Sequence, residues 1–390
     1  MRIGFHFHAT AINKDGKIFM PSFFGRWIDS IAINCDFLYC FLHDPINGEE
    51  DQQDYCIEST NVKMISIGPH SSVPMRLLSF QNKKKLIKDY LDKIDLFLLR
   101  GPSPLLPGFA KLVSDKPIVL LLVADMMAGI DSLPQPKWRK ELIRLWSLIN
   151  TYQQNKIIKK SLTFVNSHKL YKKYELSTRN LFEIKTTTLT EKDFYYRDDT
   201  CKNEPINILY TGRITKEKGV INILDAIHSL INKGIKVNYN LVGMVEKKDE
   251  TLINLLRKAN EYGISNYVFY HGYKPTGPEL FNFYINSDIY IIASQSSFEG
   301  FPRTIWEAMA HSLPVIATNV GSIPDFIEGS AELIEPMDNK LIEEAILKLL
   351  NNPELRKKYI SSGISLAKRN TLEKQSITML SIIEQWMKNQ

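Results

Sequence analysis

The residue types best placed to do chemistry lie in Ser294–Ser312, SQSSFEGFPRTIWEAMAHS, which follows a strand-like run and opens a helical one. Pro302 suits the first turn of that helix, and Gly300 permits a close approach just before it. The amides near residues 301–304 would then point out of the helix start, where free N–H donors and partial positive charge favour a phosphate. The residues grouped at this start are Gly300, Phe301, Pro302, Arg303 and Thr304.

Two carboxylates flank this predicted anion site. Glu299 precedes the helix, and Glu307 follows eight residues later on the second helical turn. Carboxylates accept strongly from the hydroxyl groups of sugars and riboses, so one glutamate for each end of a phosphate-linked ligand is chemically sensible. The alternative is an amphipathic helix with exposed glutamates, which the Gly-Phe-Pro sequence at the helix start disfavours.

A basic turn, Tyr210–Gly219 or YTGRITKEKG, lies earlier in the same half of the chain. Arg213 and Lys218 would leave a predicted strand at the carboxyl edge of its sheet. Two fixed cations there could neutralise a diphosphate and stabilise the charge that develops as it departs. The sequence contains neither G-x-G-x-x-G nor G-x-x-x-x-G-K-[ST], so the dinucleotide and P-loop interpretations lack their fingerprints.

The elements that must position these residues alternate between short apolar runs and helical-period segments, a pattern typical of an α/β fold with parallel sheets. The strands predicted in the first half are Arg2–His8, Phe37–His43, Val62–Gly68, Leu96–Arg100, Pro117–Asp125 and Leu162–Ser167. Those predicted in the second half are Ile206–Arg213, Val237–Gly243, Tyr267–Tyr273, Ile289–Ser294, Pro314–Asn319 and Glu332–Glu335. Two sheets predict two Rossmann-like βαβ domains that face a central cleft.

The predicted boundary lies in a polar stretch with a proline and no periodicity. We expect a first domain over residues 1–195, a linker over 196–205 and a second domain over 206–370. Residues 371–390 are expected to form a helix that packs back across the cleft or continues the second domain.

From Ile206 to about Tyr359 the chain resembles the donor domain of the retaining glycosyltransferases of family 4, enzymes of bacterial polysaccharide and cell-envelope synthesis with the GT-B fold. The resemblance rests on the two segments above and on NLVG at Asn240–Gly243, YHGY at Tyr270–Tyr273 and PVIATNVGSIPDFI at Pro314–Ile327. It implies a nucleotide-sugar-binding domain over 206–370 and an acceptor-binding domain over 1–195. It also implies retention at the anomeric carbon, no cofactor and no metal. The absence of any D-x-D triplet agrees with the last point.

The resemblance also implies roles for single residues. Glu299 is expected to contact hydroxyls of the donor sugar and Glu307 those of the ribose. Arg213 and Lys218 are expected at the diphosphate, with Glu299, Arg213 and Lys218 in the catalytic set. Backbone near Gly243 and Tyr273 is expected to line the donor site.

The first half offers fewer candidates. The family's Gly-Gly loop after the first strand is replaced by Asn13–Lys17, so Gly16 is the acceptor-side candidate there. Asp125, where many relatives carry a histidine, is predicted as a catalytic and acceptor contact, and its alternative role is a cap. Arg100 is predicted as an acceptor or phosphate ligand.

Other polar and aromatic residues of this half are predicted to be structural. His6 and His8 are interpreted as packed, satisfied histidines rather than metal ligands. The segment Pro136–Lys160 contains Trp138, Trp146 and Tyr152, which are expected in the core rather than in a sugar platform.

Charge and cysteine content narrow the setting. Residues 1–200 contain 28 Lys and Arg against 22 Asp and Glu, whereas residues 201–390 contain 21 of each. The basic excess has two open explanations, solvated helix faces or attraction to anionic lipid or an acidic acceptor. The four cysteines form no C-x-x-C pair, and the amino terminus lacks signal-peptide features. We therefore expect a cytoplasmic protein, with peripheral contact at the inner membrane face left open.

The expected activity is sugar transfer from a nucleotide-diphosphate-sugar to a glycan, lipid-linked or cell-envelope acceptor, without a nucleic-acid partner. Two alternatives stay open: an inactive sugar-nucleotide-binding accessory protein, and another GT-B enzyme such as a nucleotide-sugar epimerase.

Overall fold

The computed structural model describes residues 1–127, 130, 135–246, 249–297 and 299–389. Gly129 and Phe298, which fall in segments singled out by the sequence, lie outside these ranges. The chain divides into two compact units, Met1–Thr186 with Leu372–Gln390, and Thr187–Thr371. The first unit contains 28 basic and 20 acidic side chains, and the second contains 21 and 23, so the basic excess belongs to the first unit.

The first unit is built on a parallel sheet of seven strands, in the order β10-β9-β8-β7-β1-β4-β6. All six predicted strands are confirmed, and β10 is additional. Their bounds are β1 (Arg2–Thr10), β4 (Phe37–Asp44), β6 (Val62–Pro69), β7 (Leu96–Gly101), β8 (Ile118–Leu122), β9 (Leu162–Val165) and β10 (Leu181–Glu183). Their apolar composition follows from burial on both faces of the sheet.

A small antiparallel sheet, which the apolar pattern did not predict, joins three short strands of the first unit. These are β2 (Ile12–Lys14), β3 (Lys17–Met20) and β5 (Tyr55–Cys56). Asp15 and Gly16, both with positive φ, form the two-residue turn between β2 and β3.

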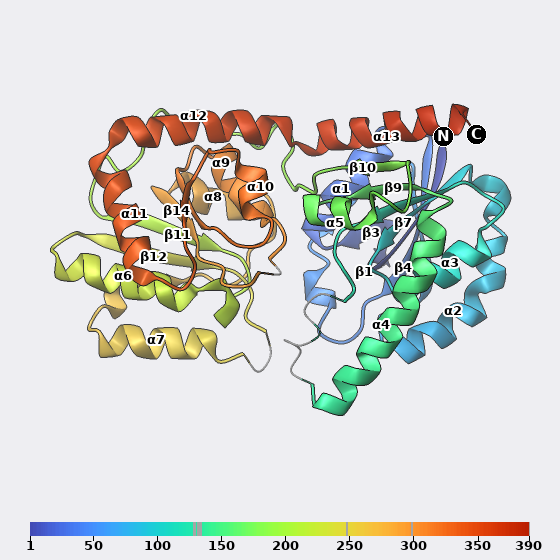
Figure 1. The fold of residues 1–390 in the computed structure, drawn as a ribbon, viewed down its shortest axis with the longest axis horizontal. Helices are drawn as coiled ribbons and strands as arrows, with labels where there is room; N and C mark the ends of the chain where they lie inside the picture. The colour runs from blue at the N-terminus through green and yellow to red at the C-terminus, as the bar shows by residue number, and fades with distance from the viewer. Residues whose placement is uncertain (128–129, 131–134, 247–248, 298, 390) are drawn as a thin grey trace. The chain divides into compact units, whose positions relative to one another are not determined.

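The tail helix α13 (Leu372–Lys388) completes the core of the first unit. It packs beside α1 (Ser22–Ala32), so the two ends of the chain lie side by side (Figure 1). Met379 and Ile383 are buried in the same cluster as Phe24 and Ile28. The other helices of this unit are α2 (Val73–Lys88), α3 (Leu106–Leu112), α4 (Lys137–Ile158) and α5 (His168–Tyr174).

The second unit holds a parallel sheet of six strands in the order β13-β12-β11-β14-β15-β16. The six predicted strands are all confirmed, as β11 (Ile206–Thr211), β12 (Val237–Val242), β13 (Val268–Tyr270), β14 (Ile289–Ile292), β15 (Val315–Thr318) and β16 (Glu332–Ile334). This is the Rossmann order 3-2-1-4-5-6, in which the direction of winding reverses between β11 and β14. Ligands of such sheets bind at the carboxyl ends of those two strands.

Seven helices of the second unit are described, and they provide the connections between and after the strands. They are α6 (Val220–Asn232), α7 (Thr251–Glu261), α8 (Pro278–Ile285), α9 (Arg303–Ala310), α10 (Ile323–Ile327), α11 (Asn339–Asn351) and α12 (Pro353–Arg369).

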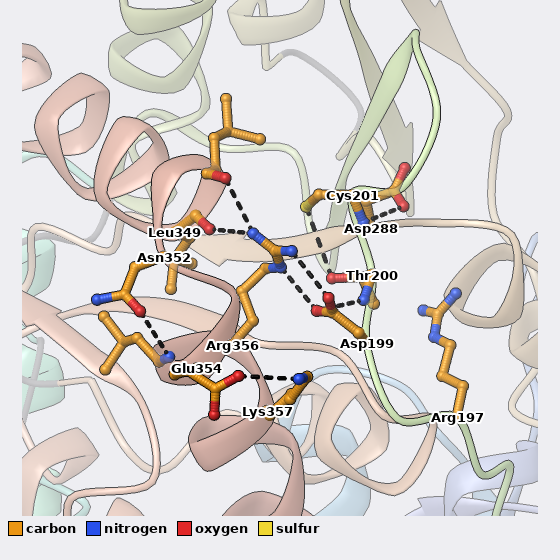
Figure 2. Close-up of polar contacts among 12 residues, drawn as sticks. Arg197, Asp199, Thr200, Cys201, Asp288, Leu349, Asn352, Glu354, Arg356 and Lys357 are labelled. Atoms are coloured by element: carbon orange, nitrogen blue, oxygen red, sulfur yellow. Dashed lines mark hydrogen bonds and ion pairs between the residues drawn. The ribbon is translucent and has the colours of Figure 1, made fainter.

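Residues 196–205, predicted as the linker, lie within the second unit. Figure 2 shows that the guanidinium of Arg356 on α12 meets both carboxylate oxygens of Asp199, with Nε–Oδ1 2.7 Å and Nη2–Oδ2 2.9 Å. Nη1 of Arg356 also donates to the carbonyl of Leu349 at 2.7 Å. The Arg197 guanidinium donates to the Ser287 carbonyl at 2.6 Å. A polar, aperiodic sequence is thus fixed by side-chain pairing that no local pattern reveals.

Helix α4 buries polar side chains and exposes apolar ones, the reverse of an ordinary amphipathic helix. Its buried residues include the polar side chains Ser147, Asn150 and Gln154. Trp138 and Tyr152, predicted in the core, are instead 66% and 61% exposed. The prediction was wrong for these two residues because it took the apolar stripe of the helix to be the buried one.

Candidate functional site

The turn after β11 is held against the end of β14 by a glycine that no other residue could replace without distortion. Gly219 has φ +67°, and a Cβ at this position would lie 2.0 Å from the carbonyl oxygen of Ala293. The amide of Gln295 donates to the Glu217 carbonyl at 2.7 Å. These contacts place Lys218 at the carboxyl ends of β11 and β14, where the winding of the sheet reverses.

Lys218 and Glu299 form an ion pair at this edge. The distance from Nζ of Lys218 to Oε2 of Glu299 is 2.6 Å, and both side chains are largely buried, at 15% and 13% exposed. The backbone of Glu299 is fixed as well, because its carbonyl accepts from the Ser322 amide at 3.0 Å. The structure therefore unites two predicted site residues that are 81 positions apart in the sequence.

Glu307 lies on α9, is 3% exposed and forms the buried part of the candidate site. Its carboxylate accepts hydrogen bonds from the hydroxyls of Thr188 and Tyr284, the latter at 2.8 Å. The Tyr284 hydroxyl also lies 2.7 Å from Oγ1 of Thr211, at the end of β11. Thr188 and Tyr284 were not predicted, and their only sequence signal is a hydroxyl side chain beside an apolar run.

The hydroxyl network continues into the start of α9. Tyr290 on β14 donates to Oγ1 of Thr304 at 2.6 Å. Burial lowers the pKa of the Arg303 guanidinium, and the nearby charge of Glu307 opposes that shift. Thr304 therefore belongs to the hydroxyl network, and Arg303 lies close enough to Glu307 to feel its charge.

Other residues at the helix start differ from the prediction in part. The helix begins at Arg303 with Pro302 at its N-cap position. Phe301 packs against Trp306 and Phe326, with ring centroids 4.4 and 4.8 Å apart. A Cβ at Gly300 would meet no atom within 4 Å. The space beside Gly300 is therefore open, and the glycines whose replacement would cause a clash lie elsewhere.

One such glycine is Gly243, after β12. It has φ +155°, and a Cβ there would lie 1.7 Å from the Gly212 carbonyl oxygen. Its amide donates to the Gly272 carbonyl at 2.8 Å. Tyr273 follows Gly272 in the sequence and is 40% exposed. Gly243 thus joins the carboxyl ends of β11, β12 and β13 into one edge.

Arg213 lies near this edge, and its guanidinium forms an ion pair with Glu246. Its Nη1 is 2.9 Å from Oε1 of Glu246, and both side chains are more than half exposed. The predicted diphosphate contact therefore requires Arg213 to exchange one exposed partner for another, which costs little because exposed ion pairs contribute about 0–1 kcal/mol.

The candidates in the first unit do not share one site geometry. Asp125 accepts from the Met127 amide at 3.0 Å and lies 2.6 Å from Nζ of Lys173, so it acts as a turn cap with a cationic partner. Gly16 is in the exposed β2–β3 turn, where it supplies positive φ. Arg100 is the last residue but one of β7, and its guanidinium lies 4.7 Å from the Phe7 ring and 5.4 Å from the Trp27 ring.

The two histidines of β1 behave differently from each other. Nδ1 of His6 bonds the Phe41 carbonyl at 3.0 Å, and its Nε2 lies 3.1 Å from the Ser103 hydroxyl. His6 is therefore packed and satisfied, as predicted. Nδ1 of His8, by contrast, is buried and has no hydrogen-bond partner among the described residues.

A comparison with protein families finds a match within the second unit. Residues 192–365 match the family model of glycosyl transferases group 1. This segment is similar to the glycosyltransferases of group 1 and is called the group 1 domain below. The group 1 domain contains the Lys218–Glu299 pair, Glu307 and the whole of the parallel sheet of the second unit.

Curated relatives of this chain include a protein of capsular polysaccharide synthesis. The capsular polysaccharide biosynthesis glycosyltransferase CapM of Staphylococcus aureus is 28% identical over 187 residues, which are 47% of this chain and 45% of CapM. The chain thus spans less than half the length of this curated relative.

Solved structures share the fold over the whole chain. Sucrose-phosphate synthase from Thermosynechococcus elongatus has a TM-score of 0.72 at 16% identity, with 100% of both chains covered. Anabaena HepE, solved with UDP and glucose, has a TM-score of 0.71 at 16% identity, with 99% of this chain and 100% of HepE covered. The group 1 domain and its partner unit therefore have the GT-B fold.

Two searches of the described residues bear on metals and membranes. None of these residues form a group of three or more His, Cys, Asp or Glu side chains arranged to hold a metal ion. No helix within the described ranges has both the length and the apolar run that crossing a bilayer requires.

Proposed function

We propose that this protein is a retaining, family 4 hexosyltransferase that moves a sugar from a nucleotide-diphosphate-sugar to a glycan, lipid-linked or cell-envelope acceptor. The observation that carries the proposal is the buried Lys218–Glu299 pair at the switch point of a group 1 domain. A cation and a carboxylate side by side at that edge suit a ligand with a diphosphate next to a sugar.

Within this proposal each residue has a chemical task. Lys218, Arg213 and the amides at the start of α9 stabilise the departing diphosphate, since fixed positive groups lower the energy of developing negative charge. Glu299 accepts from hydroxyls of the donor sugar, and Glu307 accepts from those of the ribose. The acceptor hydroxyl attacks from the face that the diphosphate leaves and passes its proton to a leaving oxygen. No metal or other cofactor takes part.

The donor is the first substrate to identify. HepE, with the same fold, was solved with UDP and glucose. This supports a uridine diphosphate sugar as the first donor to test. A thermal-shift screen with UDP, GDP, ADP and CMP is expected to show one nucleotide that raises Tm, because a ligand that binds the folded state stabilises it.

Nucleotide release from a panel of sugar nucleotides, measured with and without acceptor, tests the activity. A transferase releases the nucleoside diphosphate faster when acceptor is present. An accessory protein would bind without releasing nucleotide, and an epimerase would turn over without acceptor. Either outcome would contradict the proposal.

We further propose that the enzyme works at the cytoplasmic face of an anionic membrane and docks through α4. The exposed stripe of this helix follows helical spacing, with Trp138, Leu142, Leu145, Ile149 and Tyr152 each more than half exposed. Burying one leucine or isoleucine side chain contributes about 1.5–3 kcal/mol, so a stripe of this size would bind an apolar layer.

Charge around the stripe selects the lipid. Residues 137–160 contain seven Lys and Arg against one Glu. A pocket of about 980 Å³ near the end of α4 is lined in part by five lysines, Lys111, Lys116, Lys156, Lys159 and Lys160. Each basic residue near an anionic surface contributes roughly 1 kcal/mol, which favours an anionic over a neutral membrane.

Vesicle co-sedimentation tests this docking. Binding to vesicles of phosphatidylcholine with phosphatidylglycerol, but not to phosphatidylcholine alone, is expected, with loss at high salt. The triple change Leu142→Asn, Leu145→Asn and Ile149→Asn should abolish it, while Leu176→Asn at a 97% exposed position should not. Self-association through the stripe without vesicle binding would show that a second copy covers it instead.

A further inference from the structure

A cluster of basic side chains lies at the carboxyl edge of the sheet in the first unit. His8 comes from β1, His43 from the end of β4 and His70 from just after β6. The His43 and His8 rings lie 5.6 and 6.5 Å from the ring of His70. Because β1, β4 and β6 are neighbours in a parallel sheet, side chains that follow their carboxyl ends gather at one place.

Arg76 on the second turn of α2 completes the cluster, since its charge acts on both His8 and His43. Burial lowers the pKa of this guanidinium, and Glu49 is the opposing influence. Nε and Nη1 of Arg76 are both buried without a hydrogen-bond partner among the described residues. A guanidinium with two buried and unused donors normally pairs with a carboxylate or phosphate, which it can bind with parallel hydrogen bonds.

The acidic residue in contact with the cluster is already engaged. Oε1 of Glu49 lies 2.7 Å from Nδ1 of His70, and its Oε2 accepts from the Ile46 amide at 3.1 Å. The start of α2 adds further positive potential. Its N-cap residue Ser72 makes no side-chain capping bond, and the Ser71 hydroxyl is buried without a partner in the described chain.

His43 adds an acceptor to this positive environment. It is fully buried, and its Nδ1 must donate to the Gly68 carbonyl, 3.1 Å away. Burial lowers the pKa of His43 to about 4, so the ring is neutral near pH 7 and its Nε2 carries a lone pair. That Nε2 has no partner in the described residues. It suits a hydroxyl of the ligand.

We propose that Arg76, His8 and His43 form a binding site for an acidic sugar, with the anionic group on Arg76 and a neighbouring hydroxyl on Nε2 of His43. The anionic group is a carboxylate or a phosphate. The proposal rests on the proposed function in one respect, namely that the bound acidic sugar is the acceptor or its terminal residue. Binding of the anion itself does not depend on catalysis.

Titrations followed by NMR test the site, with glucuronic acid, glucose 6-phosphate and neutral glucose as probes. The wild-type protein is expected to bind one or both acidic probes at least tenfold more tightly than glucose. The two acidic probes distinguish a carboxylate from a phosphate. The proposal would be overturned if all three sugars bound with equal affinity, or if none of them bound.

Two variants separate the roles of the side chains. Arg76→Gln should reduce affinity for the acidic probes at least tenfold, whereas Arg179→Gln, at an exposed position of the same unit, should not. His43→Asn retains a donor for the Gly68 carbonyl but removes Nε2. The variant should lose more affinity for glucuronic acid than for a derivative of it that lacks the neighbouring hydroxyl. Unchanged affinity in Arg76→Gln would show that the anion binds elsewhere.

Nucleotide binding supplies the control for folding and for the proposed function. The preferred nucleotide should raise the Tm of both variants as much as that of the wild type, because the group 1 domain lies in the other unit. A wild type that binds acidic sugars but no nucleotide would refute the proposed function while leaving the anion site intact.

Discussion

Nζ of Lys218 lies 2.6 Å from Oε2 of Glu299, and the two side chains are almost equally buried. The cation predicted for the diphosphate and the carboxylate predicted for the sugar are thus each other's partners in this structure. Removing one partner of a buried pair leaves the other charge without compensation, which costs more than removing both.

A double-mutant cycle on this pair gives the first prediction. Lys218→Met and Glu299→Gln should each lower the free energy of unfolding, and the double variant should lose less than the sum. The coupling energy is expected at about 0.5–3 kcal/mol, as found for residues in direct contact. Denaturant unfolding measures it, and additive losses would show that the pair is not formed in solution. Turnover in Lys218→Met should also fall by ~10²-fold or more.

The second prediction concerns Glu307 and its hydroxyl partners. Glu307→Gln should weaken nucleotide binding by about 10–100-fold, because a hydrogen bond to a charged group contributes roughly 1.5–3 kcal/mol. Tyr284→Phe removes one donor to Glu307 and leaves the carboxylate in place, so it should affect Tm more than nucleotide affinity. Calorimetry with the preferred nucleotide decides. If Glu307→Gln binds nucleotide like the wild type, Glu307 is a structural acceptor for Thr188 and Tyr284 only.

Acid sensitivity of the Asp199–Arg356 pair is the third prediction. Burial raises the pKa of Asp199, but the hydrogen bonds from Arg356 and the Thr200 amide outweigh it, so the pKa is lowered overall. A lowered folded-state pKa stabilises the protein above about pH 4, the ordinary aspartate value, and this stabilisation is lost as pH falls through the folded pKa.

Asp199→Ala should therefore cost about 3–5 kcal/mol at pH 7, as expected when a buried pair loses one member. The difference from the wild type should shrink as the pH is lowered below 4. Chemical denaturation at pH 7, 5 and 3 measures this trend. A difference that is constant over that range would mean that Asp199 is not ionised against Arg356.

The fourth prediction is metal independence. The chain has no D-x-D triplet to hold a metal on the diphosphate, and positive charge from Lys218 and Arg213 takes that part in the proposed reaction. Activity should survive EDTA without change in kcat. Inactivation that manganese or magnesium reverses would contradict the assigned roles of both side chains.

The strands and the candidate donor residues could be predicted because their signals are local. A strand buried on both faces must be apolar along its whole length, so runs such as Ile289–Ser294 indicate β14 directly. The placement of Glu299 before a helix start and of Glu307 on its second turn follows from helix geometry and from the Gly-Phe-Pro sequence. Resemblance to a known family then supplied their tasks.

The partners of these side chains were decided by tertiary structure alone. Lys218 and Glu299 are 81 residues apart, and Asp199 and Arg356 are 157 apart. No periodicity relates such positions, because each pairing depends on which distant segments the fold brings side by side. For the same reason the sequence did not predict the proposed acidic-sugar site, since His8, His43 and Arg76 come from three different elements.

Helix α4 shows the same division between local pattern and tertiary context. Its sequence determines that Trp138, Leu142 and Leu145 share one face, because residues three or four apart lie above one another on a helix. Sequence does not determine which face meets the core, and here Ser147 and Asn150 are buried instead. Amphipathic spacing fixes the stripe, whereas only the packing of the neighbouring elements decides whether that stripe is covered.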